Sequence, residues 1–465
     1  MGGSRTLGVP NGRCTVLLHD LRLALRSFKR TPILTVLMVT AIAAGIGAAM
    51  ITITLYHARA GHPIWWKEDK LFAVALDNRG SDHKGEELQK HPEYPPNTLS
   101  YRDAKALYAS RIPTHAVRMY QTYRTLDPGR AGIKPFGVQG RVMTADFFTM
   151  FDVPMKYGTG WNRAADEAPE PVVVIGKRLN EKLFDGANSV GKSVTLSAKQ
   201  FRVIGVVDSW MPTPKFYDVN AAFGVAEDFY LPFGWAEALQ LPPAGVGCVT
   251  PDAKVNSFVD LLTADCNMLQ YWVELPTRES VDRFRQFVDN YTVDEKRHGR
   301  FVRAPNNRVL NVTDWLALND VIGDESRVQV GLAAMFLGVC ILNTLGLMLA
   351  KFLGAAHVTG LRRALGASRK HIIRQHLTEV VVVGLVGGMV GIVFAWLGLW
   401  AIRVLTFIPG PNDSPDRLVM AQSLSHMDLR MLGLALLISM VTGIVAGLYP
   451  AWRIGRAAPA TFLKT

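Results

Sequence analysis

The sequence predicts an α-helical membrane protein with four transmembrane helices and an α+β domain outside the membrane. Three observations carry this prediction: four long runs without charged side chains, three short segments that hold the whole excess of positive charge, and a large insertion between the first two runs. The composition, 49% hydrophobic and 19% charged, would also fit a large soluble enzyme, so the distribution of the residues decides.

Each of the four runs is long enough to cross a bilayer. At about 1.5 Å per helical residue, roughly 20 apolar residues span a hydrocarbon core about 30 Å thick. Ala58, Arg59 and Ala60 resemble a signal cleavage site, but a signal peptide has a shorter apolar region of about 7–15 residues. We therefore predict an uncleaved first span. The runs are Ile33–Leu55, Val330–Ala350, Val380–Ile402 and Met431–Tyr449.

Positive charge predicts the orientation. Residues 1–32 contain six Lys or Arg and one acidic residue, residues 351–379 contain six and one, and residues 451–465 contain three and none. The rest of the chain has 36 basic and 37 acidic residues, out of totals of 51 and 39. Because Lys and Arg near membrane ends stay in the cytoplasm, both termini are expected there. The net charge of +12 therefore reports topology and does not indicate nucleic-acid binding.

The expected organisation follows the chain in order. An amphipathic helix over Leu17–Arg30 is expected to lie on the inner leaflet, in contact with membrane lipid. The segments are a cytoplasmic N-terminal segment 1–32, span 33–56, a periplasmic domain 57–327, span 328–350, a cytoplasmic coupling segment 351–379, span 380–402, a periplasmic loop 403–428, span 429–450 and a cytoplasmic tail 451–465.

The periplasmic domain reads as α+β with a mostly β inserted subdomain. Strand patterns at Leu71–Leu76, Thr114–Leu126 and Leu269–Leu275 alternate with amphipathic helices at Tyr101–Tyr108, capped by Thr98, and at Thr277–Lys296. Residues 135–250 differ, with short apolar strands, many Gly and Pro, and one short helix at Lys177–Phe184. At this size the domain can bury its own core and is expected to form two subdomains.

Polar residues within the spans are few and uncharged. Asn343, Thr344, Ser439 and Thr442 are isolated, so no substrate site or proton relay is expected in the membrane. The eleven His are scattered, and neither a metal-ligand spacing nor a catalytic triad can be assembled. Small residues in the third span permit close helix approach, either within one subunit or between two; they are Gly384, Gly387, Gly388 and Gly391.

Two of the four cysteines, Cys248 and Cys266, lie in the predicted periplasmic domain. Since that compartment is oxidising, we predict that they form a disulfide. Two separate buried thiols remain the alternative, because the sequence does not supply the Cα separation that a bridge needs.

One segment matches a phosphate-binding loop. Gly186, Gly191, Lys192 and Ser193 fit the pattern G-x-x-x-x-G-K-[ST]. That loop requires a strand before it and a helix after it, because the helix N-terminus supplies the anion site. Here a predicted helix precedes the segment and a predicted hairpin follows it. We therefore predict that it binds no nucleotide.

Three sets of residues resemble the MacB-type permeases, the family also called FtsX-like. The first set lies in the predicted periplasmic domain, the second between the second and third spans, and the third at the end of the chain, so the likeness covers nearly the whole chain. They are Pro171–Gly176, Leu179–Phe184, Val190–Val194 and Phe201–Val207; Gly360–Ile372; and Tyr449–Arg453 with Ala458 and Pro459.

The resemblance implies a non-catalytic permease subunit of an ABC transporter. In that family ATP-driven dimer closure is relayed by the helices to the outer domain, so this chain holds no cofactor and a partner ATPase binds ATP and Mg²⁺. Arg362 and Arg363 are expected to dock that ATPase, whereas Lys351, Arg374 and Arg453 follow the topology or bind lipid headgroups. The implied coupling residues are Gly360, Leu361, Arg362, Arg363, Leu365, Gly366 and Ala367.

The sequence departs from the family pattern in two places. Residues 1–32 are too few for the fused ATPase domain of MacB itself, so a separate ATPase chain is expected. The acidic residue before the Gly-Leu-Arg-Arg run is replaced by Val358, beside His357, which leaves a homodimer and a heterodimer with a related permease both open.

The leading function is efflux with a periplasmic adaptor and an outer-membrane channel. The alternatives are FtsX-like signalling to an envelope hydrolase, disfavoured by the size of the insertion, and lipoprotein extraction like that of the LolC and LolE permeases.

Overall fold

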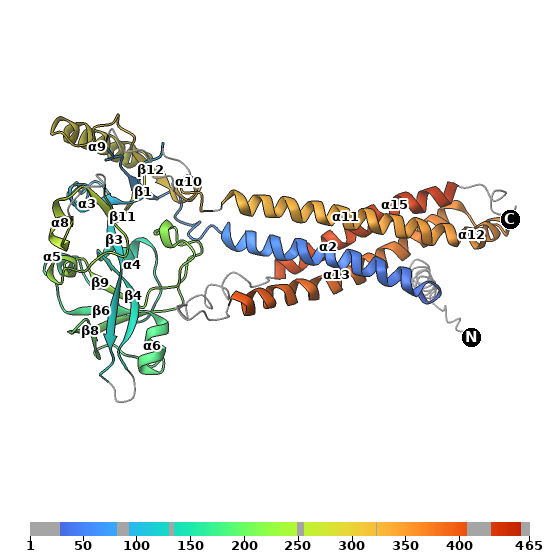
Figure 1. Cartoon of the computed structure of the whole chain (residues 1–465), viewed down its shortest axis with the longest axis horizontal. Coiled ribbons are helices and arrows are strands. Elements are labelled where there is room, and N and C mark those ends of the chain that lie inside the picture. Colours follow the sequence, from blue (N-terminus) through green and yellow to red (C-terminus); the bar gives the residue numbers. More distant parts are fainter. Residues whose placement is uncertain are drawn as a thin grey trace, which may run out of the picture. The chain divides into compact units, whose positions relative to one another are not determined.

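The computed structural model describes residues 28–80, 93–129, 134–248, 255–321, 323–406 and 429–456. Two compact units result: residues 1–60 together with 323–465, and residues 61–322 (Figure 1). Most of the predicted helix Leu17–Arg30, nearly all of the loop 403–428 and the end of the tail, with Ala458 and Pro459, lie outside the described residues.

The first unit contains the four long helices, as predicted. Each is long and apolar enough to cross a membrane. Their ends extend beyond the uncharged runs, because polar residues at a bilayer surface continue a helix without entering the hydrocarbon. The third helix begins near Ser368, as expected, well before Val380. The helices are α2 (Pro32–Arg59), α11 (Asp324–Gly354), α13 (Arg369–Thr406) and α15 (Leu429–Arg456), with the short α12 (Ala356–Ala364) between α11 and α13.

The small residues of α13 pack within this one unit. A Cβ added at Gly384 would lie 3.1 Å from the Cα of Gly443 on α15, and one at Gly388 would collide with the hydroxyl of Ser439 on the same helix. Gly387 and Gly391 meet α2 in the same way, at Ile42 and at the carbonyl of Ala43. Of the two alternatives left open by the sequence, packing inside one subunit therefore accounts for the glycines.

The second unit is built on one mixed sheet. Its strand order is β12-β1-β11-β3-β4-β9-β6-β8-β5, with β2 and β10 added to β11, and β7 added to β3 and β8. The strands are β1 (Leu71–Ala75), β2 (Leu99–Ser100), β3 (His115–Asp127), β4 (Phe136–Met143), β5 (Met155–Gly158), β6 (Val172–Ile175), β7 (Ser193–Leu196), β8 (Lys199–Val207), β9 (Phe229–Pro232), β10 (Gly247–Cys248), β11 (Cys266–Glu274) and β12 (Arg308–Asn311).

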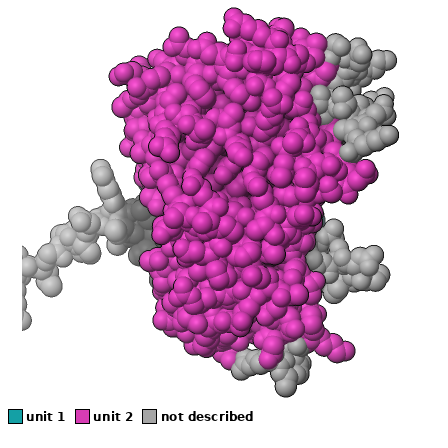
Figure 2. Space-filling view, turned by 90° about the vertical axis from the view of Figure 1, so that its left-hand side faces the viewer, with its two compact units in different colours: residues 1–60, 323–465 teal, residues 61–322 magenta. Residues whose placement is uncertain are grey.

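Both faces of the sheet are covered, which explains why its central strands are apolar on both sides. On β11, Tyr271 and Val273 enter one core cluster while Trp272 between them enters the other. Figure 2 shows one face of this unit in magenta. The α-helices are α3 (Tyr101–Tyr108), α4 (Asp146–Met150), α5 (Ala164–Glu167), α6 (Lys177–Phe184), α7 (Trp235–Ala238), α8 (Phe258–Thr263), α9 (Arg278–Arg297) and α10 (Val312–Leu318), and Val219–Ala221 forms a 3-10 turn.

Two details differ from the sequence prediction. The β-rich region 135–250 shares the sheet with the rest of the domain, since β4 pairs with β3 along its whole length, and residues 61–322 form one unit instead of two subdomains. The cap of α3 is Ser100, whose hydroxyl accepts from the N–H of Asp103, because Thr98 lies too far ahead of the helix.

The first and last strands of the unit are neighbours. β1 follows α2 in the chain, β12 precedes α10 and α11, and the two strands pair antiparallel from Phe72 opposite Asn311 to Ala75 opposite Arg308. Both connections to the first unit therefore leave from adjacent strands, of which β12 is at the edge of the sheet.

Candidate functional site

The predicted coupling residues form a short helix with a defined end. They fall on α12 and on the turn after it, where Gly366 adopts a φ of +99°. This left-handed conformation is favourable for glycine alone, and it ends α12. Two residues later the hydroxyl of Ser368 accepts a hydrogen bond of 3.3 Å from the N–H of His371 and so caps α13.

The outer face of this helix is apolar and unpartnered within the described residues. Val358, Leu361 and Leu365 follow at helical spacing and are 43%, 50% and 81% exposed. Arg362 is also exposed, and its Nη1 donates to Gln375 Oε1 on α13 at 3.3 Å. The side chain of Arg363 lies outside what the structure describes, Gly360 is buried and Ala367 is half-buried.

A buried ion pair that the sequence did not reveal joins the two long helices that flank α12, α11 and α13. Lys351 at the end of α11 and Glu379 on α13 are both buried, and the Lys351 ammonium donates to the Glu379 carboxylate. The ammonium also lies 4.9 Å from the centre of the Phe28 ring. Lys351 was expected only to follow the topology or to bind lipid, so this pairing corrects the prediction.

A cavity of about 460 Å³ lies between this pair and α12, within the first unit. Its lining includes Arg30, Arg362 and His376 along with the ion pair itself. The His376 ring contacts the Phe352 ring at a tilt of 50°, with ring centres 4.3 Å apart. α12 and the ends of α11 and α13 therefore line the same cavity.

The segment that matches a phosphate loop has the surroundings expected from the sequence. α6 precedes it, and the β7–β8 hairpin follows it. The N–H groups of Gly186, Gly191 and Lys192 donate to the backbone oxygens of Asn180, Val203 and Ser189. Groups engaged in this way cannot cradle a phosphate. That no nucleotide binds here stays a prediction.

The second unit has a buried charged cluster at its centre. Arg141 is fully buried and donates to Asp218 Oδ2 at 2.5 Å and to Glu227 Oε1 at 3.0 Å. Burial alone would raise the pKa of Glu227, but the charges of Lys215 and Arg141 outweigh it and hold that pKa at about 2. With its charges paired and its hydrogen bonds made, the cluster ties β4 to the residues before β9.

Cys248 and Cys266 face each other across β10 and β11 and are joined by a disulfide. Their Cα atoms are 3.9 Å apart. The disulfide therefore tethers the segment that follows Pro242 to the central strand of the sheet.

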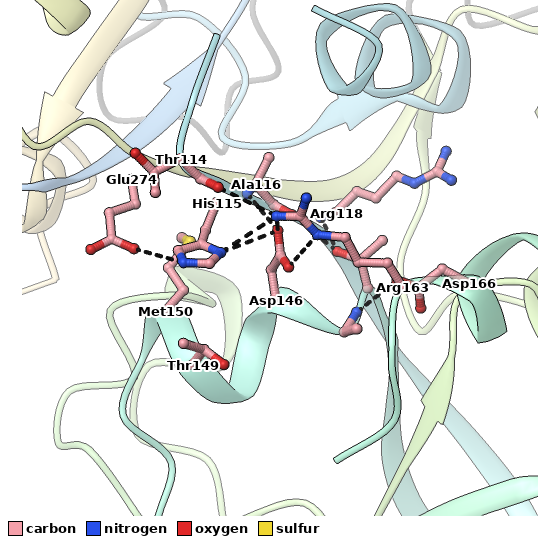
Figure 3. Close-up of polar contacts among 12 residues, drawn as sticks. Thr114, His115, Ala116, Arg118, Asp146, Thr149, Met150, Arg163, Asp166 and Glu274 are labelled. Carbon is pink, nitrogen blue, oxygen red and sulfur yellow. Dashed lines mark hydrogen bonds and ion pairs between the residues drawn. The ribbon is translucent and has the colours of Figure 1, made fainter. Parts of the chain in front are cut away.

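A second polar cluster lies where β3 begins, as Figure 3 shows. Arg163 donates two hydrogen bonds to the Asp146 carboxylate, from Nε to Oδ1 at 2.8 Å and from Nη2 to Oδ2 at 2.7 Å. His115 lies between two carboxylates, at 3.6 Å from Asp146 and 3.9 Å from Glu274. The N–H of Ala116 on β3 donates to Asp146 Oδ2 on α4 at 3.1 Å, so the cluster links β3 to α4. Among the described residues no group of three or more His, Cys, Asp or Glu is arranged to hold a metal ion.

The chain has four membrane-length helices, and a folded domain is inserted between the first and the second of them. A family model described as the MacB-like periplasmic core domain matches residues 35–291, and one described as the FtsX-like permease C-terminal region matches residues 330–459. The chain therefore belongs to the MacB-like, FtsX-like permease family, as its motifs indicated.

Named relatives agree with this family. The chain is 26% identical over 305 residues to the macrolide export ATP-binding/permease protein MacB of Rhodopirellula baltica, covering 63% of this chain and 40% of that protein. It is 23% identical over 320 residues to the pyoverdine export ATP-binding/permease protein PvdT of Pseudomonas savastanoi, covering 69% and 42%. The chain thus matches about two-fifths of the length of these relatives. The crystal structure of the periplasmic region of MacB from Actinobacillus actinomycetemcomitans is 15% identical, with a TM-score of 0.34, and covers 54% of this chain and 94% of that one.

Proposed function

We propose that this protein is the permease subunit of a MacB-type ABC transporter in the bacterial inner membrane, driven by a cytoplasmic ATPase on a separate chain. The observation that carries the proposal is the exposed apolar surface formed by Val358 and Leu361 on α12 and by Leu365 on the turn after it. An apolar surface of this kind, exposed on the connection between two membrane helices, marks a site where another molecule binds. The ATPase is the partner that the family membership favours.

The distribution of charge supports the side on which this partner binds. The segment 351–379 and both ends of the chain carry fifteen basic and two acidic residues between them. By the positive-inside rule these segments are cytoplasmic, where ATP is available, and the unit 61–322 is periplasmic.

The transport step would be mechanical. ATP-driven closure of two permease copies would move α12, and the Lys351–Glu379 pair would pass that movement to α11 and α13. No charged side chain lies inside the four uncharged runs, so substrate is expected to be moved by the outer domain and not through the bundle. We further propose export of a small molecule through a periplasmic adaptor and an outer-membrane channel, because relatives are named for macrolide and pyoverdine export.

Affinity purification of the full chain in mild detergent tests both levels of the proposal. An ABC ATPase should co-purify, and an adaptor should accompany it if the protein works in efflux. Recovery of an envelope hydrolase or of a lipoprotein carrier in place of the adaptor would contradict efflux and support signalling or lipoprotein extraction.

Substitutions on α12 test the docking face. Leu361→Asp and Leu365→Asp should abolish recovery of the ATPase, because each places a charge in the apolar contact. Val302→Asp is the matched control, since Val302 is 55% exposed but lies in the outer unit. Full recovery of the ATPase with both α12 variants would overturn the assignment of this face.

A further inference from the structure

A pocket of about 460 Å³ opens in the second unit where four elements meet. Its walls come from α3, from the start of β3, from α5 and from the turn between β9 and α7. The volume is in the range that holds a small molecule, roughly 300–1,000 Å³. The lining includes Tyr101, Lys105, Tyr108, Arg118, Asp166 and Phe233.

Arg118 is the central group of this pocket. Its guanidinium lies between two aromatic rings, at 4.1 Å from the centre of Phe233 and 4.8 Å from that of Tyr108. Rings on both sides hold the plane of the guanidinium and leave its edge for hydrogen bonds. In Figure 3 its side chain points away from the Asp146–Arg163 pair.

No described carboxylate forms an ion pair with Arg118. The polar group that faces it is the hydroxyl of Tyr101, which itself donates to Glu237. Asp166 is engaged elsewhere, since it accepts from the N–H of Ala145 at 2.8 Å and from Trp161 Nε1 at 2.9 Å. Among the described residues, the Arg118 guanidinium therefore contacts two rings and the Tyr101 hydroxyl but forms no ion pair with a carboxylate.

Two buried side-chain atoms on neighbouring strands have no hydrogen-bond partner in the part of the chain that the structure describes. They are Arg118 Nε and the hydroxyl of Tyr271, and Tyr271 is only 2% exposed. The two residues are direct cross-strand neighbours on β3 and β11, so their side chains lie on the same face of the sheet. Of these two residues Arg118 lines the pocket, whereas Tyr271 lies behind its wall.

We propose that this pocket binds the carboxylate of a small zwitterion, an amino acid or a short peptide, on Arg118. Guanidinium and carboxylate match each other in a two-bond arrangement. Lys105 and Arg111 add positive charge at the pocket, while Glu167 and Glu237 supply acceptors for an ammonium or amide N–H at the other end of the ligand. A doubly charged anion such as phosphate fits this mixture of charges less well. The inference is independent of ATPase docking at α12.

Titration calorimetry on the full chain in detergent micelles tests the proposal, with tri-alanine as the probe. Tri-alanine should bind, and tri-alanine with an amidated C-terminus should bind at least tenfold more weakly because it cannot pair with the guanidinium. Inorganic phosphate should bind more weakly than tri-alanine. Equal binding of the acid and amide forms, or tighter binding of phosphate, would overturn the proposal. Binding of none of the three would overturn it as well and leave a water-filled pocket.

Three variants keep the test independent of folding. Arg118→Met retains the packing between the rings and should reduce affinity for tri-alanine at least tenfold. Ala109→Trp, at an exposed position of the lining, should block the pocket without touching the core. Arg102 is an exposed residue of α3 that pairs with Glu295 and does not line the pocket. The control variant Arg102→Met should therefore bind tri-alanine with wild-type affinity. Wild-type affinity in the Arg118 and Ala109 variants would refute the site.

Discussion

Breaking the Lys351–Glu379 pair should loosen the helix bundle by an amount that can be worked out from its burial. The two side chains are only 4% and 6% exposed, so removal of one partner leaves the other buried without its main counter-charge. Such a change costs about 3–5 kcal/mol, whereas replacing both partners by apolar residues is close to neutral. Lys351→Met and Glu379→Leu should each be strongly destabilising, and the double variant should be milder than either.

Cys340 provides the assay for this prediction. It is a free, buried cysteine on α11, and its side chain fills the space beside Gly45 of α2. Since 1.4 kcal/mol is a factor of ten, a loss of 3–5 kcal/mol should speed modification of this thiol by a maleimide by roughly 10²–10³-fold or more when the bundle opens as a unit. The measurement uses a Cys14→Ser background so that Cys14 does not contribute to the labelling.

Lys370→Met is the control, because Lys370 is exposed and close to the same helix end. Its labelling rate should stay at the wild-type value. If Lys351→Met also left the rate unchanged, or if the double variant were as reactive as the single ones, the ion pair would not hold the bundle together.

Three further measurements test other features of the structure. Gly384→Leu should lower the thermal stability of the detergent-solubilised chain by roughly 1–3 kcal/mol of overpacking, while Gly346→Leu, which meets nothing within 4 Å, should have no effect. Reduction should raise the mass by two hydrogens and destabilise the outer unit by about 3 kcal/mol, as expected for a disulfide between Cys248 and Cys266, 18 residues apart; an unchanged mass would exclude the bridge. Burial raises the pKa of Asp166 from 3.8 to about 6, so the folded state binds the proton of this carboxyl more tightly than the unfolded state does. The protonated carboxyl therefore contributes about 3 kcal/mol to the free energy of unfolding, fully below pH 3.8 and progressively less as the pH rises through 6. Asp166→Asn should remove this pH dependence from the free energy of unfolding.

The sequence predicted those features that depend on neighbours along the chain. Hydropathy located the four spans, alternation located β3, and short apolar runs located β1 and β11, because these signals are local. The end of α12 at Gly366 and the start of α13 near Ser368 were also readable, since glycine and serine have specific roles at helix ends.

What the sequence missed depends on distant residues meeting in space. The Lys351–Glu379 pair joins residues on two helices, and a sequence separation of 28 carries no helical or strand periodicity. Arg118 is an ordinary position in an alternating strand, and only the folded sheet places it between Tyr108 and Phe233. The glycines of α13 predicted a close helix contact, but only the folded structure shows that the contacted helices are α2 and α15 of the same chain.

The pairing of β1 with β12 joins the two places where the chain enters and leaves the outer unit. One span enters the domain through β1 and the next leaves it through β12, so a shift of either helix pulls on the same pair of hydrogen-bonded strands. The remaining strands continue from β1 without a break in the order, and residues 61–322 form one compact unit. A force applied to the β1–β12 pair would therefore act on the same sheet that carries the strands farthest from it.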